Sequence, residues 1–170
     1  MTHRNILTTL AILTIFALIF AAWVFIPQLK TVPDDVMEVP KSDPTIYIDT
    51  TLNYGLRQPW YAGAWVRNRF RYRIALIYHW NSPRETLREG KGVCIDYATL
   101  LCSLLRSEGI DAWVVVGYTS PLAIAKHAWV VSGKYVIDFQ ANYLAVPKGW
   151  QELYRFNEAV VKTAGCEAEE

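Results

Sequence analysis

The sequence has few cysteines and histidines, and their spacing is not that of metal ligands. It holds three of each in 170 residues, with no CxxC or HxxxH spacing. The tetrahedral sites built from such pairs are therefore not predicted, and we expect neither a metal nor a cofactor. Three cysteines are also too few for a disulfide framework, and the odd number leaves at least one thiol free or available to a second chain.

The chain also lacks an excess of charge of either sign. Its 17 lysines and arginines nearly balance its 16 aspartates and glutamates, for a net charge of +1. This balance gives no long-range field to attract nucleic acid, which we exclude as a partner. Large rings are abundant by contrast, with 7 tryptophans and 10 tyrosines. They predict an aromatic core or a groove with aromatic walls.

A segment without charge occupies residues 6–26. As a helix its 21 residues would be about 31 Å long, enough to cross a hydrocarbon core of roughly 30 Å. A cleaved signal peptide would have a shorter apolar region, ending in a small-x-small site, whereas Ala21 and Ala22 are followed by Trp23 and further large residues. We expect a single-pass membrane anchor. The flanking charges barely set its orientation, and we favour a domain outside the cytoplasm.

The rest of the chain divides by composition. Four prolines between residues 27 and 44 predict an extended tether. The expected organisation is an anchor over residues 1–27, a proline-rich tether over 28–44, one catalytic domain over 45–165 and an acidic tail over 166–170. No internal repeat is present.

The order of the predicted elements gives the fold class. We expect helices at residues 60–78, from Ser82 to about Glu89, at 94–107 and near 151–162, and strands at 45–52, 112–118, 127–132 and 135–139. The last two strands flank Gly133-Lys134, a two-residue hairpin turn. Helices followed by consecutive strands predict an α+β domain with an antiparallel sheet.

Cys94 opens the third of these helices. A helix amino terminus lowers the pKa of a thiol through its dipole and free N–H groups, and the thiolate is the reactive form. The plain alternative is that a cysteine in an apolar helix only packs in the core, which is our interpretation of Cys102. Cys94 is therefore a candidate nucleophile only if a general base lies beside it.

The hairpin supplies a candidate base. If Ser132 pairs with Tyr135, side-chain alternation puts His127 and Asp138 on one face, one diagonal step apart. A slip of one residue would separate them onto opposite faces. We expect the helix that carries Cys94 to pack on that same face. The three groups would then form a triad in which sulfur attacks a carbonyl, imidazole moves the proton and carboxylate orients the ring.

Other residues are expected to support this triad. The backbone N–H of Cys94 is one natural oxyanion donor, and the second is left open among Trp60, Tyr61 and Asn81. Asp96 is expected to favour the helix start as a first-turn acid or to support the triad, and Trp129 to lie beside the histidine.

Three motifs resemble one known family. Residues 83–112, which include Gly-Val-Cys94-Ile-Asp96-Tyr-Ala, are similar to the nucleophile motif of the transglutaminase-like superfamily. Lys126-His127-Ala-Trp129-Val and Tyr135-Val-Ile-Asp138 resemble its histidine and aspartate motifs. The resemblance implies a papain-like core and thiol acyl chemistry on amides.

Three functions remain open from the sequence. The leading hypothesis is a membrane-anchored cysteine peptidase or amidase that hydrolyses peptide or isopeptide amides of a protein or peptide substrate. The second is an acyltransferase that crosslinks protein glutamine to an amine through the same triad. The third is a non-catalytic binding module that uses the aromatic groove.

Overall fold

The computed structural model describes residues 14–18, 47–73, 80–123 and 125–164. The chain divides into one unit over residues 1–31 and another over residues 32–170. In the first unit, residues 14–18 are helical. Among the described residues, no helix has the length and apolar character needed to cross a membrane. The rest of the predicted anchor over residues 6–26, the tether and the acidic tail lie outside the described residues.

Within the described part of the second unit, three helices precede the main sheet: α2 (Pro59–Arg69), α3 (Pro83–Glu89) and α4 (Cys94–Ser107). The start of α3 forms as its sequence predicts, since the Ser82 hydroxyl accepts the Glu85 N–H and the Glu85 carboxylate accepts the Ser82 N–H at 2.8 Å. Helix α3 ends at Gly90, whose φ of 63° is a left-handed conformation that glycine adopts without strain. The predicted bounds of α4 are confirmed.

Six antiparallel strands form the sheet, in the order β6-β5-β4-β3-β7-β8. The strands are β3 (Trp113–Tyr118), β4 (His127–Ser132), β5 (Tyr135–Ile137), β6 (Asn142–Tyr143), β7 (Gln151–Phe156) and β8 (Val161–Thr163). A separate parallel pair joins β1 (Arg71–Tyr72) to β2 (Lys91–Gly92). The predicted α+β class with an antiparallel sheet is confirmed.

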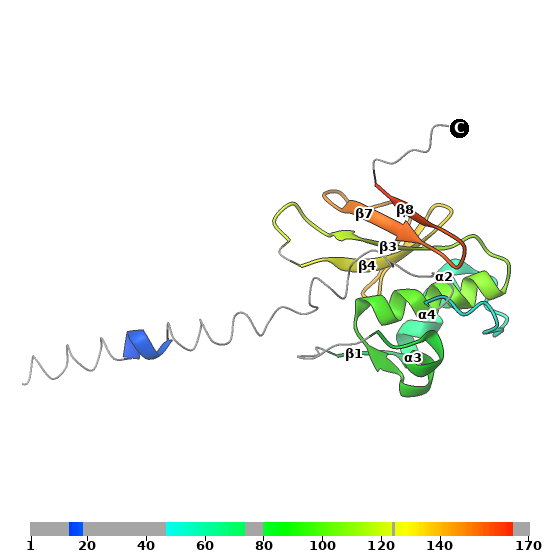
Figure 1. Ribbon diagram of the computed structural model, residues 1–170, viewed down its shortest axis with the longest axis horizontal. Helices are drawn as coiled ribbons and strands as arrows, with labels where there is room; N and C mark the ends of the chain where they lie inside the picture. Colours follow the sequence, from blue (N-terminus) through cyan, green and yellow to red (C-terminus); the bar gives the residue numbers. More distant parts are fainter. Residues whose placement is uncertain (1–13, 19–46, 74–79, 124, 165–170) are drawn as a thin grey trace, which may run out of the picture. The chain divides into compact units, whose positions relative to one another are not determined.

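Helix α4 lies against one face of this sheet, with α3 beyond it (Figure 1). Every side chain from Cys94 to Leu105 is buried, so α4 is a central helix. It shares the main core with Ala128 and Val130 of β4 and with Ile137 of β5. A second, aromatic cluster covers the opposite face of the sheet around Trp129. Burial on both faces explains the valine-rich sequence of β3.

The predicted helix near residues 151–162 is wrong, because the segment forms β7 and β8. Tyr154 and Phe156 are buried at a spacing of two, and β7 pairs with the central strand β3. The Asn157 side chain accepts the N–H groups of Ala159 and Val160 at 2.9 and 3.0 Å, which fixes the turn between the two strands. An Asx turn and pairing with β3 therefore replace the helix.

Two other boundaries differ from those predicted. No strand forms over residues 47–52, the described part of the strand expected at 45–52; the segment is a turn, in which Asp49 accepts the N–H and hydroxyl of Thr51. The helix expected at residues 60–78 ends at Arg69, because Phe70 is extended and β1 follows. Residues 74–79 of that expected helix lie outside the described residues.

Candidate active site

Cys94 is the first residue of α4 and is only 2% exposed. Its backbone N–H belongs to the first turn, whose donors have no acceptor inside the helix. The Asp96 carboxylate accepts the Val93 N–H at 2.9 Å. A β-carbon on Gly92 would lie 2.3 Å from that carboxylate, so only glycine fits there. The Gly-Val-Cys-Ile-Asp sequence thus builds a tight helix start that holds the thiol at its end.

Asp96 also joins this helix start to the preceding segment. Its second oxygen accepts the Asn81 N–H at 3.1 Å, and the side chain is 1% exposed. A buried carboxylate with two N–H donors at a helix amino terminus is well compensated. Asp96 therefore supports the backbone at the start of α4, from which the Cys94 side chain projects.

His127 and Asp138 meet where two neighbouring interior strands, β4 and β5, begin and end. A nitrogen of the imidazole, Nε2, lies 2.8 Å from Oδ1 of Asp138. The hairpin has the predicted register, with Ser132 opposite Tyr135 and Gly133 at a φ of 55°. His127 begins β4 and Asp138 follows the last residue of β5, so the antiparallel pairing brings the two together.

The position of α4 relative to these residues differs from the prediction. We expected it on the face that carries His127 and Trp129, but α4 packs on the opposite face, against Ala128 and Val130. Side chains at the end of a strand are not separated by the sheet. Cys94 therefore approaches His127 past the end of β4, and its interaction with the imidazole is one of the causes that raise the pKa of His127.

Opposing effects set the charge of His127. Burial lowers the pKa of the imidazole, but hydrogen bonds to Asp138 and Cys94, and the charges of both, outweigh it and raise the pKa to about 10. The ring is thus an imidazolium at neutral pH.

Aromatic rings hold the imidazole from the outer side of the sheet. Trp129, 1% exposed, lies parallel to the His127 ring with centroids 6.4 Å apart. Trp150 approaches the same ring edge-on at 6.1 Å and contacts Trp129 at 4.9 Å. Trp129 lies beside the histidine as expected, and Trp150 is an addition that no motif indicated.

The three oxyanion candidates lie in different surroundings. Trp60 and Tyr61, in the first turn of α2, are 46% and 60% exposed, and the Trp60 ring packs on Tyr135 at 6.1 Å. Tyr135 is at the start of β5, whereas Asp138 comes directly after the end of that strand, so the Trp60 ring packs at the other end of β5 from the carboxylate. Asn81 is 7% exposed, and its Nδ2 is buried without a hydrogen-bond partner in the described part of the chain. Among the described residues, the Nδ2 group of Asn81 is therefore an unused hydrogen-bond donor, whereas the Trp60 ring packs against Tyr135 of β5.

Tyr72 lies near Cys94 although the sequence gave no reason to select it. Its strand β1 pairs with β2, which places Tyr72 opposite Gly92, two residues before Cys94. Burial and the neighbouring Cys94 raise the pKa of Tyr72 well above its usual value. A two-residue parallel pair leaves no periodic pattern, and its partners are 20 positions apart in the sequence.

Arg67 is a second residue that the sequence did not reveal. From α2, its guanidinium donates to the backbone oxygens of Phe139 at 2.8 Å and Asp138 at 3.0 Å. It also donates to the side chain of Asn142. Arg67 thereby fixes the backbone that carries the carboxylate. The Phe139 N–H adds a bond to Asp138 Oδ1 at 2.7 Å.

No group of three or more histidine, cysteine, aspartate or glutamate side chains among the described residues could hold a metal ion. What the described residues bring together is a thiol, an imidazolium and a carboxylate. Such a set can carry out nucleophilic acyl chemistry.

Comparison with known proteins connects these residues to a family. The family model of the transglutaminase-like superfamily matches residues 56–154, more than half of the chain. The Centrosomal protein of 76 kDa from Danio rerio is 45% identical over 53 residues, 31% of this chain and 8% of that protein. A UPF0252 protein of Methanocaldococcus jannaschii is 33% identical over 86 residues, 46% of this chain and 24% of that protein. The chain thus spans less than a quarter of the length of these curated relatives.

Solved structures share the fold. Calcium-bound Legionella pneumophila LapG matches with a TM-score of 0.56 and 17% identity, over 65% of this chain and 70% of that chain. A Cytophaga hutchinsonii protein described as a candidate cysteine protease matches with a TM-score of 0.52 and 21% identity, over 75% of this chain and 50% of that chain. At these identities the likeness establishes the fold.

Proposed function

Because this chain belongs to the transglutaminase-like superfamily, we propose that it is a cysteine peptidase or amidase whose nucleophile is Cys94. The observations that carry the proposal are the 2.8 Å hydrogen bond between His127 and Asp138 and the position of Cys94 at the start of α4, where it contributes to the raised pKa of His127. Its substrate class is a peptide or isopeptide amide of a protein or peptide.

In the acylation step, the sulfur of Cys94 forms a bond to the amide carbonyl carbon, and the carbonyl electron pair moves to oxygen. When the tetrahedral intermediate collapses, the carbon–nitrogen bond breaks and the nitrogen takes the proton of the His127 imidazolium. The products are an amine and a thioester. Asp138 keeps the ring oriented through this transfer by its 2.8 Å hydrogen bond.

In the deacylation step, neutral His127 takes a proton from water while the water oxygen bonds to the thioester carbon. The carbon–sulfur bond breaks, which releases a carboxylic acid and restores the thiolate–imidazolium pair. If an amine attacks in place of water, the product is a new amide, which is the crosslinking alternative. We favour hydrolysis, and product analysis with and without added amine separates the two.

The direct test is labelling of the full-length chain with an acylating probe that reacts with thiols, followed by mapping of the modified residue. We expect the label on Cys94, with buried Cys102 as the internal control. A folded chain that carries no label on Cys94 would contradict the proposal and favour a non-catalytic binding module.

We also propose that residues 6–26 anchor the enzyme in a membrane, with the catalytic domain outside the cytoplasm. The support is the run of 21 residues without charge. Alkaline carbonate washing of membranes tests the anchor, since a spanning segment stays in the pellet. Protease treatment of intact cells tests the orientation. Release by carbonate would contradict the anchor.

A further inference from the structure

We propose that Arg71, Arg73 and Lys91 form a binding surface, the arginine face, for an acidic segment of the peptide substrate that flanks the amide reacting at Cys94. This inference deepens the proposed function and rests on it. The triad alone leaves the charge of the substrate open, since it reacts with an amide whatever the neighbouring side chains are.

Basic residues are concentrated in one stretch of the chain. Residues 67–91 hold seven of the 17 lysines and arginines but only two of the 16 aspartates and glutamates. The two acids are Glu85, which forms the capping box of α3 with Ser82, and Glu89. The near balance of the whole chain therefore contains a local excess of positive charge.

Strand pairing brings part of this charge onto one surface. In the parallel β1–β2 pair, Arg71 lies directly opposite Lys91, and Tyr72 lies opposite Gly92. The Arg73 N–H donates to the Gly92 oxygen at 2.7 Å and extends the ladder by one residue. Because side chains alternate along a strand, the three basic residues share one face of the ladder.

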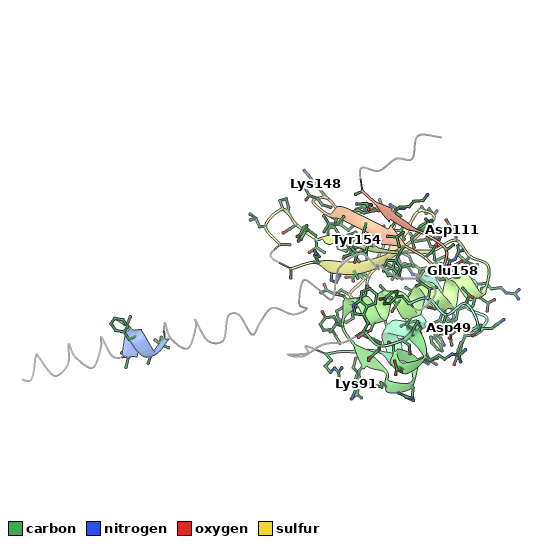
Figure 2. The ribbon with its side chains drawn as sticks, in the orientation of Figure 1. Asp49, Lys91, Asp111, Lys148, Tyr154 and Glu158 are labelled. Atoms are coloured by element: carbon green, nitrogen blue, oxygen red, sulfur yellow. The ribbon has the colours of Figure 1, made fainter. Side chains whose placement is uncertain are left out.

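The other face of the ladder points into the protein. The Tyr72 ring packs against the main core and stacks on Phe139, with centroids 4.6 Å apart. Arg71 and Lys91 are exposed on the opposite side, and Figure 2 labels Lys91 at the surface of the domain. The arginine face is therefore available to a partner.

The charges of the arginine face are not neutralised by other described residues. Arg71, Arg73 and Lys91 belong to none of the ion pairs in that part of the chain. The Nε atom of Arg73 is buried there without a hydrogen-bond partner. Like charges directly opposite each other in a ladder are destabilising, so Arg71 and Lys91 weaken the strand pair. An anionic partner would remove this repulsion.

The distance from Cys94 suits a peptide that is bound for reaction. Lys91 is three residues before Cys94, so their Cα atoms are at most about 11 Å apart. An extended peptide covers that length in roughly three to four residues. Because the arginine face points away from the Tyr72 side of the ladder, it would bind the segment that flanks the amide and not the amide itself.

The observations favour a peptide over a lipid surface as the anionic partner. Arginine pairs with carboxylates through two parallel hydrogen bonds, and two of the three residues are arginines. Anionic lipids are concentrated in the cytoplasmic leaflet, whereas we propose a domain outside the cytoplasm. The partner groups are therefore aspartate and glutamate side chains of the substrate.

The experiment measures how fast peptides label Cys94 in the full-length protein in detergent. The peptides differ only in a run of four glutamates or four glutamines. Each carries an amino-terminal chloroacetyl group or a carboxyl-terminal chloromethyl ketone, from which the sulfur displaces chloride and forms a thioether. We expect the glutamate peptide to label Cys94 about tenfold faster in at least one orientation. Added salt should reduce this advantage, because it screens exposed charges.

Variants locate the effect on the arginine face. Arg71→Gln combined with Lys91→Gln should bring the two peptides to within about twofold of each other. Lys134→Gln combined with Lys162→Gln, in the β4–β5 turn and on β8, removes two exposed charges elsewhere and should keep the full advantage. Iodoacetamide, which is small and uncharged, should label Cys94 equally in all three proteins. Lys91→Gln alone should lose part of the advantage, which keeps the test available if the double variant does not fold.

Equal labelling of the parent by both peptides in both orientations would overturn the inference. An advantage that the control variant loses as fully as the arginine-face variant would also overturn it, since net charge would then be the cause. If the peptides react equally and trypsin cleaves after Lys91 more slowly in phosphatidylglycerol than in phosphatidylcholine bicelles, the face contacts lipid instead. Acylation of Cys94 without a preference for glutamate would leave the proposed function standing, whereas a Cys94 that is never acylated would contradict that function itself.

Discussion

Two cysteines on one helix have different chemistry. Cys94 and Cys102 lie eight residues apart on α4, and both are buried, with exposures of 2% and 0%. Cys102 donates its S–H to the Ala112 oxygen at 3.5 Å, and burial raises the pKa of its thiol far above the usual range. Cys94 instead lies at the helix start, where it contributes to the raised pKa of both His127 and Tyr72. Burial alone makes a thiol inert, and partners at a helix amino terminus make it a nucleophile.

The two ends of α4 also differ in the groups that surround them. At the carboxyl end, Arg106 pairs with Glu158 and with Asp111, and the hydrogen bond to Glu158 raises the pKa of Arg106 further. Figure 2 labels Asp111 and Glu158 at the same end of the molecule. These are partly exposed ion pairs that complement the helix dipole. They anchor the helix, whereas the groups at its amino end are arranged around one sulfur.

The largest expected effect separates the two thiols directly. Cys94→Ala should abolish turnover with little change in unfolding temperature, because no other side chain supplies the nucleophile. Cys102→Ala should keep turnover within about twofold and lose roughly 1 kcal/mol of stability to a small cavity. Activity assays and thermal unfolding of both variants measure this contrast. Equal activity in Cys94→Ala and the parent would end the enzyme proposal.

The next effect removes the partner that distinguishes Cys94. His127→Ala should lower turnover by several orders of magnitude, since members of a triad act as a unit. Alkylation of Cys94 at neutral pH should slow towards the rate of Cys102, because the imidazolium no longer favours the thiolate. Rates of iodoacetamide labelling at each cysteine, read by mass spectrometry, test this. Unchanged labelling of Cys94 would place its activation elsewhere.

Local sequence was enough to predict those parts of the fold that local interactions determine. The bounds of α4, the hairpin register and the capped start of α3 follow from helical spacing, a two-residue turn and a serine cap. The meeting of His127 and Asp138 followed from the same register. Each of these features is determined within about a dozen residues of chain.

Features set by distant pairing could not be predicted in this way. The apolar residues of β7 fit a helix as well as a strand, and pairing of Phe156 with Val114 of β3 decides between them. The face on which α4 packs depends on the whole sheet. Tyr72 and Arg67 join the site through contacts made 20 and 71 positions away in the sequence. These two carry no local signal of their role.

A smaller effect should follow from loss of ring orientation. Asp138→Asn keeps the shape of the side chain but replaces the acceptor of the 2.8 Å bond from His127 with an amide. We expect a fall in kcat that is comparable to or milder than that of His127→Ala, through the wrong tautomer. The bond of the Phe139 N–H to this side chain can persist, so folding should be retained. A normal kcat would mean that the carboxylate only supports the turn.

Arg67, which holds the backbone of Asp138 and Phe139, should affect activity less than Asp138 itself. Arg67→Lys keeps the charge but cannot make both bonds to the Phe139 and Asp138 oxygens. We expect a loss of about 1–3 kcal/mol in the free energy of unfolding and a fall in kcat of about tenfold. A purely structural role would lower stability without moving kcat or its pH profile. Arg69→Lys, on the exposed side of α2, is the matched control.

The last expected effect leaves turnover unmeasured and concerns pH and stability at the two ends of α4. The pKa of His127 is raised to about 10 in the folded chain, above its usual value near 6.5. A raised pKa means that the folded state holds the proton more tightly, so this stabilisation is fully present below about pH 6.5 and is lost as pH rises through about 10. Urea unfolding of the parent and of His127→Gln between pH 6 and 10.5 should therefore give curves that converge with rising pH. Arg106→Gln removes a group that stays charged over this range, so its difference from the parent should stay constant. Parallel curves for His127→Gln would mean that the imidazole holds no extra proton in the folded chain, and that Cys94 is activated by its place on the helix alone.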